Sequence, residues 1–387
     1  MFLKGPRQLL LFFGNPRTGK TTLLEYLFNY VSSLSLAYHL TGFLTKEVKS
    51  NGERLGFDLI YLRDREFTLP LARRKDLVTT SRKPSVGKYV VFLENLERII
   101  EVLKADLSKA SLSPLIFIDE IGKMEVLSDK FINFMEHLRE EKHIVVATLG
   151  LGEHPFLRDW SAKREAIYIE VTPENRDFLK DRLKVEFYRE GKLIVLEGID
   201  GAGKSTLFEL LKGEPLFSTF IFSQEPTTGS YGLKVREALS SKAISPDKLS
   251  ELFLLDRKEH VKDLILPNLM EGKKIFLDRY YLSTVAYQGV YVEEPLTLLK
   301  RNETYAPIPD LVIYLNVPVE LALRRIRARN TRVSIFEKEE FLLKVSGIYE
   351  EFLPLFTHVR IEANRALDAL LTSLKEILKS FTDDLQA

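Results

Sequence analysis

Two phosphate-binding loops in one chain constrain the fold more than any other feature of the sequence. Each loop follows a short apolar run (residues 9–13 or 193–196) and precedes a segment with helix-like spacing of apolar residues. In that context, glycines let backbone N–H groups face phosphates, and the helix N-terminus adds a favourable dipole. The residues expected to bind triphosphates are Gly14, Asn15, Pro16, Arg17, Thr18, Gly19, Lys20, Thr21 and Thr22 in the first loop, and Gly198, Ile199, Asp200, Gly201, Ala202, Gly203, Lys204, Ser205 and Thr206 in the second.

Two nucleotide sites in 387 residues predict two domains, each large enough to bury its own core. Apolar strands alternate with amphipathic helices in both halves. This pattern predicts an α/β fold with two P-loop NTPase domains, each a mostly parallel β-sheet sandwiched by helices. We place the domains at residues 1–187 and 188–387, and we expect them to be joined tightly because no Gly/Ser- or Pro-rich linker lies between them.

Charge and cysteine content limit the classes of function. The 56 basic and 55 acidic residues balance, so no net field favours nucleic acid or a membrane surface as a partner. The sequence has no apolar run of transmembrane length and no cysteine, which fits a reducing cytoplasm. We therefore expect a cytoplasmic protein without membrane or nucleic-acid partners. The absence of cysteine and the charged fraction of 29% also hint at a thermophilic source.

The second half of each phosphate loop contains the residues expected to contact the phosphates and the Mg²⁺ ion of a bound triphosphate. Lys20 and Lys204 would reach the β- and γ-phosphates. A hydroxyl residue follows each lysine, and an aspartate ends an apolar strand further along each half. The residues expected to hold Mg²⁺ are Thr21, Asp119, Ser205 and Asp278.

The residue after the strand-ending aspartate differs between the halves. Glu120 is a carboxylate that can polarise a water molecule aimed at the γ-phosphate, which favours hydrolysis. Arg279 takes the same place in the second half, and a guanidinium binds a phosphate through two parallel hydrogen bonds. The second half is therefore predicted to transfer a phosphoryl group to a phosphorylated acceptor such as a nucleoside monophosphate.

The first half resembles a known family over about residues 6 to 185. Residues 42–48, 54–57, 86–89 and 171–177, and above all the run DEIGKME at 119–125, are similar to the thermostable nucleoside-triphosphatase (cancer-related NTPase) family. The resemblance implies slow, Mg²⁺-dependent hydrolysis of ATP, GTP and other nucleoside triphosphates. Arg17 departs from the family, which usually has a small residue there, and could either contact the γ-phosphate or point to solvent.

The second half resembles thymidylate kinases over residues 192 to about 360. The similar segments are residues 197–206, 224–227, 255–260 and the run DRYYLSTVAYQG at 278–289. The resemblance implies Mg²⁺-dependent transfer from ATP to dTMP and a homodimer formed through this domain. It also implies that Tyr287 stands where a 2′-hydroxyl would lie, so that UMP is a poor substrate. The residues that it implies for dTMP are Asp200, Glu225, Pro226, Arg257, Arg279, Ser283, Tyr287 and Gln288.

A run of arginines after the strand at residues 311–317 resembles the mobile lid of thymidylate kinases. Some members of that family have an arginine in the phosphate loop where this chain has Ala202, so the lid should supply the charge that stabilises transfer. Many bacterial relatives have Asp-Arg where this chain has Ser334-Ile335, which leaves Arg329 or Arg332 for the role. The residues expected to act in catalysis are Lys20, Glu120, Lys204, Arg279, Arg329 and Arg332.

Two other functions remain open from the sequence. The first half is alternatively a nucleotide-dependent switch or a nucleic-acid-binding module, although it lacks a concentrated basic stripe with interleaved aromatic residues. The second half is alternatively a deoxynucleoside kinase, which would need a base to deprotonate a 5′-hydroxyl group.

Overall fold

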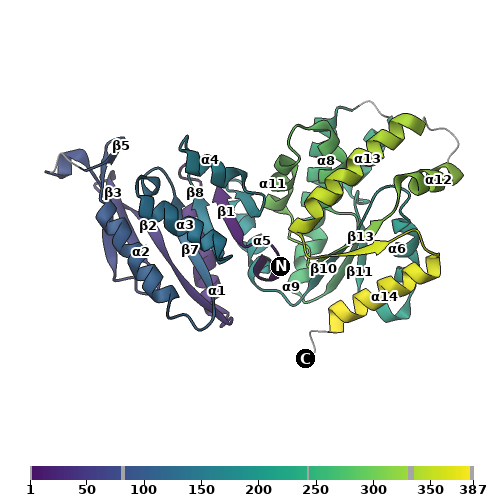
Figure 1. The fold of residues 1–387 in the computed structure, drawn as a ribbon, viewed down its shortest axis with the longest axis horizontal. Helices are drawn as coiled ribbons and strands as arrows, with labels where there is room; N and C mark the ends of the chain where they lie inside the picture. Colours follow the sequence, from purple (N-terminus) through teal and green to yellow (C-terminus); the bar gives the residue numbers. More distant parts are fainter. Residues whose placement is uncertain (1, 80–82, 242–243, 330–334, 384–387) are drawn as a thin grey trace. The chain divides into compact units, whose positions relative to one another are not determined.

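A computed structural model describes residues 2–79, 83–241, 244–329 and 335–383 of the chain (Figure 1). The chain forms two compact units: an N-terminal unit, Arg7–Lys184, and a C-terminal unit, Met1–Pro6 with Val185–Ala387. Residues 1–6 and 185–187, which the sequence placed in the first domain, thus group with the second. The physical reason is local packing, since the ring of Phe2 lies edge-on to that of Phe187 at a centroid distance of 6.0 Å.

Among the described residues, the N-terminal unit contains a nine-stranded sheet of order β5-β6-β4-β3-β2-β7-β8-β1-β9. Strands β2, β7, β8, β1 and β9 are parallel, and the remaining strands extend the sheet in antiparallel pairs. The strands are β1 (Leu9–Phe13), β2 (Tyr38–Ser50), β3 (Glu53–Tyr61), β4 (Thr68–Arg74), β5 (Ser85–Val86), β6 (Tyr89–Val91), β7 (Ser113–Ile121), β8 (Ile144–Leu149) and β9 (Ala166–Glu170). The helices are α1 (Lys20–Ser33), α2 (Leu93–Leu107), α3 (Asp129–Glu140), α4 (Pro155–Ala162) and α5 (Arg176–Phe187).

The described part of the C-terminal unit contains a five-stranded sheet of order β11-β12-β10-β13-β14, in which every pair is parallel. The strands are β10 (Lys192–Glu197), β11 (Ile221–Gln224), β12 (Lys274–Asp278), β13 (Leu311–Asn316) and β14 (His358–Glu362). The helices are α6 (Lys204–Lys212), α7 (Ser230–Ser241), α8 (Pro246–His260), α9 (Leu266–Met270), α10 (Tyr281–Gln288), α11 (Leu296–Tyr305), α12 (Val319–Arg329), α13 (Ile335–Phe352) and α14 (Leu367–Asp383).

The sequence of each phosphate-loop strand explains its central place in the sheet. Four of the five residues of β1 are buried, and all six residues of β10 are buried. Strands that are covered on both faces read as continuous apolar runs, and their carboxyl ends are where parallel α/β sheets bind ligands. The predicted α/β fold with two mostly parallel sheets is confirmed. No helix in the described ranges is long and apolar enough to cross a membrane.

The two sheets differ in where the strand-ending aspartate lies. In the C-terminal unit, β12 carries Asp278 and pairs directly with the loop strand β10. In the N-terminal unit, β7 carries Asp119, and β8 lies between it and the loop strand β1. The halves therefore share a binding plan without being copies of one another.

Candidate active sites

The first phosphate loop connects β1 to α1, and its backbone carbonyl groups accept hydrogen bonds from the lysine of the loop. Nζ of Lys20 donates to the carbonyl oxygens of Gly14 and Asn15 at 2.9 and 3.1 Å. Gly14 has a φ of 139°, and a Cβ atom there would overlap the carbonyl oxygen of Val171. Only glycine fits this position, and the loop keeps its ammonium group where a triphosphate would lie.

Asp119 lies two residues before the end of β7, which runs to Ile121 rather than ending at the aspartate as predicted. Hydroxyl and amide donors hold its carboxylate. Its Oδ1 accepts a hydrogen bond from Thr148 Oγ1 at 2.6 Å, and its Oδ2 accepts one from the backbone N–H of Thr45 at 3.3 Å. Burial raises the pKa of Asp119, although hydrogen bonds from Thr148 and Thr21 oppose this shift. The Thr21 hydroxyl and the Asp119 carboxylate therefore meet, and such oxygen ligands suit Mg²⁺.

Glu120 occupies a notch that two glycines leave open. A Cβ atom at Gly150 would overlap Oε1 of Glu120, and one at Gly122 would lie 2.9 Å from that oxygen. Burial and the charge of Asp119 raise the pKa of Glu120. Gly150 was not predicted from the sequence, where the repeated glycines at 150 and 152 were the available signal.

Glu125 is a second buried carboxyl group in this site that the sequence analysis did not assign. Its side chain is 4% exposed, and burial together with the charge of Glu120 raises its pKa to about 8. The signal was the second acidic residue in the DEIGKME run. Together these groups line a cavity of about 550 Å³ that begins at the loop residues Gly14, Pro16 and Lys20. Arg17 is exposed, has a φ of 68°, and is not among the described residues that line the cavity.

The second phosphate loop, between β10 and α6, repeats the arrangement around Lys204. Its Nζ donates to the carbonyl oxygens of Gly198 and Ile199 at 2.7 and 3.0 Å. Burial, with the charge of Arg279, lowers the pKa of Lys204 to about 7. Ser205 Oγ donates to Oδ2 of Asp278 at 3.2 Å.

The remaining carboxylate oxygen of Asp278 tests whether a metal ion fits this site. Oδ1 of Asp278 is buried and has no hydrogen-bond partner among the described residues. A buried carboxylate oxygen without a partner is costly, and a hard cation would satisfy it. The donor set of Ser205 and Asp278 therefore fits Mg²⁺.

Arg279 lies at the centre of the second site. Its Nη2 donates to Oδ1 of Asp200 at 2.6 Å, and its Nη1 donates to Ser283 Oγ at 3.0 Å. Its guanidinium carbon lies 5.1 Å from the ring centroid of Tyr287, and the hydroxyl of Tyr287 accepts from the backbone N–H of Asp200 at 2.8 Å. Phosphate loop, strand end and helix α10 thus converge on one guanidinium group.

All eight residues predicted for dTMP line one cavity of about 180 Å³. They are Asp200, Glu225, Pro226, Arg257, Arg279, Ser283, Tyr287 and Gln288. Four further lining residues were not predicted: Leu239, Phe253, Tyr280 and Thr284. Leu239 and Phe253 lie outside the segments that carry the resemblance, whereas Tyr280 and Thr284 lie within the run DRYYLSTVAYQG, which was the available signal.

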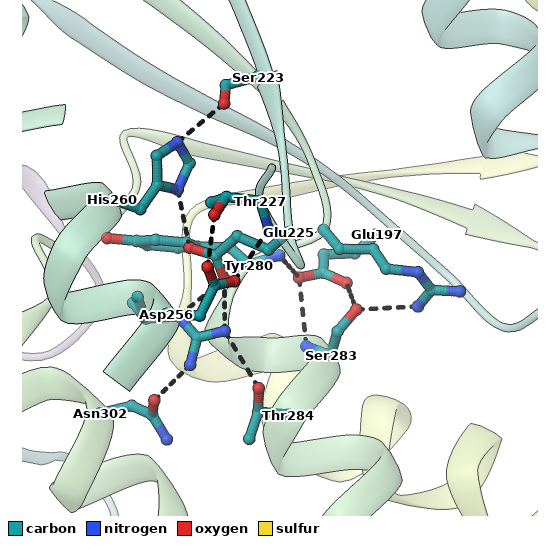
Figure 2. Close-up of polar contacts among 12 residues, drawn as sticks. Glu197, Ser223, Glu225, Thr227, Asp256, His260, Tyr280, Ser283, Thr284 and Asn302 are labelled. Carbon is teal, nitrogen blue, oxygen red and sulfur yellow. Dashed lines mark hydrogen bonds and ion pairs between the residues drawn. The ribbon is translucent and has the colours of Figure 1, made fainter. Parts of the chain in front are cut away.

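A buried hydrogen-bond network holds Arg257 at this cavity. Oε2 of Glu225 accepts from Nε and Nη2 of Arg257 at 2.9 and 2.5 Å, and Oε1 accepts from Nδ1 of His260 at 3.0 Å. Figure 2 shows His260 between Glu225 and Ser223. The Oγ atom of Ser223 lies 2.8 Å from Nε2 of His260. Arg257 also contacts Thr284 and Asn302. The carboxylate only accepts hydrogen bonds, so Nδ1 of His260 carries a proton.

Glu197, the last residue of β10, makes hydrogen bonds to residues of the same site. Its Oε1 accepts from the backbone N–H groups of Tyr280 and Ser283 at 3.0 and 3.2 Å, and its Oε2 accepts from Ser283 Oγ at 2.6 Å (Figure 2). Oε2 also accepts from the hydroxyl of Tyr349 at 2.9 Å. Burial raises the pKa of Glu197. Sequence reasoning did not assign a role to this residue, although a glutamate ending an apolar strand was visible.

The segment that the sequence predicts to form a lid is described only in part. Arg325 on α12 donates to the carbonyl oxygens of Gly201 and Ala202, both at 3.3 Å, and to that of Ala363 at 2.8 Å. Arg329 is the last residue of α12, and Arg332 lies outside the described residues. A separate cavity of about 320 Å³ lies beside Ala202 and is lined by Gly203, Thr206, Leu207, Arg325, Ala328, Arg365, Leu367 and Leu370.

The geometry defines two nucleotide-binding units of the P-loop class, one with a glutamate and one with an arginine after the strand-ending aspartate. A family model described as NTPase matches residues 10–184, and one described as thymidylate kinase matches residues 196–372. The chain belongs to the thymidylate kinase family through its C-terminal unit, which an NTPase-family domain precedes.

Curated relatives support this assignment. The thymidylate kinase of Desulfotalea psychrophila is 41% identical over 202 residues, which cover 49% of this chain and 96% of that protein. The thymidylate kinase of Brachyspira hyodysenteriae is 38% identical over 195 residues, covering 48% of this chain and 95% of the relative. The thymidylate kinase of Akkermansia muciniphila is 43% identical over 165 residues, which cover 42% of this chain and 79% of that protein.

Proposed function

We propose that the chain is a bifunctional enzyme. The C-terminal unit transfers the γ-phosphoryl group of ATP to dTMP, giving ADP and dTDP. The N-terminal unit hydrolyses nucleoside triphosphates such as ATP and GTP to diphosphates and phosphate. As further predictions, each activity is confined to its own unit, and the chain forms a homodimer through the C-terminal unit.

The observation that carries the kinase proposal is the gathering of the eight predicted residues around one cavity beside the second phosphate loop. The guanidinium of Arg279 presents N–H groups to the acceptor phosphate and offsets repulsion between the two substrates. Arg257, held by Glu225, faces the acceptor base. The ring of Tyr287 is fixed by Asp200 and Arg279, so it cannot turn away from an added 2′-hydroxyl group.

The donor would bind on the other side of the second loop. The cavity beside Ala202 has an apolar wall that includes Leu367 and Leu370, as an adenine base requires. Lys204 would contact the donor phosphates, and Ser205 with Asp278 would hold Mg²⁺. The ion neutralises charge on the phosphoryl oxygens, and Lys204, Arg279 and a lid arginine (Arg329 or Arg332) add to this stabilisation.

The observation that carries the hydrolase proposal is the notch around Glu120. Gly122 and Gly150 give the carboxylate room at the edge of a cavity that also contains Lys20. There Glu120 can orient a water molecule and accept its proton as the γ-phosphate is cleaved. Thr21 and Asp119 would hold Mg²⁺ in this unit.

Separate substitutions in the two loops test the division of activities. Lys20→Ala should abolish triphosphate hydrolysis measured without dTMP and leave dTMP phosphorylation intact. Lys204→Ala should do the reverse. Equal loss of both activities in either variant would contradict two independent sites. Competition of dTMP against thymidine as acceptor separates the proposed kinase from a deoxynucleoside kinase.

A further inference from the structure

The large cavity of the N-terminal unit lies on the acceptor side of its phosphate loop. The two loops align residue by residue, so that Pro16 corresponds to Asp200, and Glu120 corresponds to Arg279 as the residue after the strand-ending aspartate. Asp200 and Arg279 line the acceptor cavity of the C-terminal unit. Pro16 and Glu120 line the cavity of about 550 Å³ in the N-terminal unit.

The residues of the first loop that correspond to the donor-binding residues of the second loop do not line the large cavity. In the C-terminal unit, the cavity proposed for the donor base touches the loop at Ala202, Gly203 and Thr206. None of the corresponding residues (18, 19 and 22) is among the described residues that line the large cavity. Gly19 instead lies against Arg176, since a Cβ atom there would be 3.4 Å from Cδ of that arginine. The large cavity is therefore not the site of the donor base.

The cavity is also far larger than hydrolysis requires. A water molecule occupies about 30 Å³ of liquid volume, against a cavity of about 550 Å³. Strands β3, β4 and β6, which have no counterpart among the described strands of the C-terminal unit, supply an apolar and aromatic wall of Phe57, Leu71 and Tyr89. Such a wall can pack against a planar, apolar ring of a ligand.

The polar residues that line the cavity include both cationic side chains and carboxylates. Arg54, Lys88 and Lys123 provide positive charge. Arg54 pairs with Glu47, but its Nε is buried and has no hydrogen-bond partner among the described residues. Arg54 and Lys88 come from the antiparallel extension and can hold an anionic group of a ligand. Glu120 lines the cavity at the loop end, where it would repel a phosphate but accept a hydrogen bond from a hydroxyl group.

We propose that this cavity binds a second substrate, a small alcohol with a flat apolar body and an anionic group, to whose hydroxyl the N-terminal unit transfers the γ-phosphoryl group. The proposal rests on the triphosphate site proposed above and deepens it. The hydroxyl oxygen bonds to the γ-phosphorus as the bond from that phosphorus to the β–γ bridging oxygen breaks. The nucleoside diphosphate leaves with the electron pair, and the hydroxyl proton passes to Glu120. Hydrolysis is the same reaction with water in the unfilled cavity.

The test uses the full chain with γ-labelled GTP and Mg²⁺, without dTMP, and is repeated in the Lys204→Ala variant to silence the kinase site. Adenosine 3′-monophosphate and pyridoxine 5′-phosphate carry all three features, whereas adenosine lacks the anion and glycerol 3-phosphate lacks the ring. We expect adenosine 3′-monophosphate or pyridoxine 5′-phosphate to form a labelled phosphate ester in place of free phosphate. The yield of ester should be at least tenfold higher than with adenosine or glycerol 3-phosphate. Hydrolysis without ester from either compound, or equal ester from the two controls, overturns the proposal. Absence of hydrolysis as well would overturn the proposed hydrolase function.

Charge substitutions locate the acceptor. Arg54→Gln and Lys88→Gln should each raise the half-saturating concentration of the productive probe by about tenfold, the effect of losing a charged hydrogen bond. Lys109→Gln is the matched control, because Lys109 is an exposed lysine of the same unit and is not among the described residues that line the cavity. An equal effect of Lys109→Gln, or none from the two cavity variants, would place the probe elsewhere.

Discussion

Arg279 and Asp200 form an ion pair at the cavity proposed for dTMP, with Nη2 of the arginine 2.6 Å from Oδ1 of the aspartate. The aspartate is 47% exposed and the arginine 20% exposed, so an incoming nucleotide can reach both groups. In the proposed kinase reaction, the same guanidinium group would exchange its carboxylate partner for the acceptor phosphate. Asp200 would then be free to face the sugar of the acceptor.

The first prediction concerns the sugar contact of Asp200. In the wild type, dTMP should be used better than 3′-deoxythymidine monophosphate, because the carboxylate accepts a charged hydrogen bond from the 3′-hydroxyl. Asp200→Ala should reduce the ratio of the two kcat/KM values by about tenfold. Steady-state kinetics with both acceptors measures the ratio. Asp247→Ala, at an exposed aspartate of α8, should leave it unchanged.

The second prediction concerns Arg279 itself. Arg279→Lys keeps the charge but loses the planar fork that binds a phosphate with two hydrogen bonds. We expect kcat/KM for dTMP to fall by about a hundredfold or more, with triphosphate hydrolysis by the N-terminal unit unaffected. Retention of wild-type kcat/KM in this variant would remove Arg279 from the acceptor phosphate site.

The third prediction concerns His260, which fixes Glu225 and through it Arg257. His260→Ala leaves Oε1 of Glu225 buried without a donor, so the carboxylate can rotate and displace the guanidinium group. KM for dTMP should rise by about tenfold with a smaller change in kcat. His260→Gln, which restores an N–H donor, should recover most of the loss. Failure of glutamine to do better than alanine would show that His260 acts only by filling space.

The fourth prediction concerns Gly150. The Cβ atom of Gly150→Ala would overlap Oε1 of Glu120 and push the carboxylate out of its notch. Hydrolysis by the N-terminal unit should fall by about tenfold or more, and adding Glu120→Gln should lower it little further because both changes remove the same function. Phosphorylation of dTMP by the same preparation is the internal control for folding and concentration.

The fifth prediction concerns the pH dependence of stability that Glu125 introduces. Its folded-state pKa is raised to about 8 from an ordinary value of 4.5, so the folded state binds a proton that the unfolded state has lost between these values. The contribution is fully present below pH 4.5 and is lost as the pH rises toward 8, at up to about 1.4 kcal/mol per pH unit.

The fluorescence of Trp160 offers a selective measurement of this effect. Trp160 is the one tryptophan of the sequence and is fully buried in the N-terminal unit, so its emission follows the unfolding of that unit. Glu125→Gln, which stays neutral, should flatten the fall in unfolding free energy between pH 5 and 8. Glu141→Gln, at an exposed glutamate, should leave the slope as it is. A slope that Glu125→Gln does not change would contradict the raised pKa.

Sequence reasoning found what local motifs specify and missed what depends on distant contacts. The loop residues around Lys20 and Lys204 follow from spacing, because glycines and a helix start are local features. The acceptor residues followed from family resemblance, and they do meet at one cavity. Glu197 and His260 were missed because their importance appears only through partners far along the chain.

The position of Phe2 against Phe187 has a consequence for dissecting the two activities. Residues on both sides of the N-terminal unit in the sequence, 1–6 and 185–187, belong to the C-terminal unit. A truncation that begins at residue 188 would strip two aromatic rings from the remaining body and confuse misfolding with loss of catalysis. Point substitutions in the intact polypeptide are therefore the sound way to separate the two chemistries.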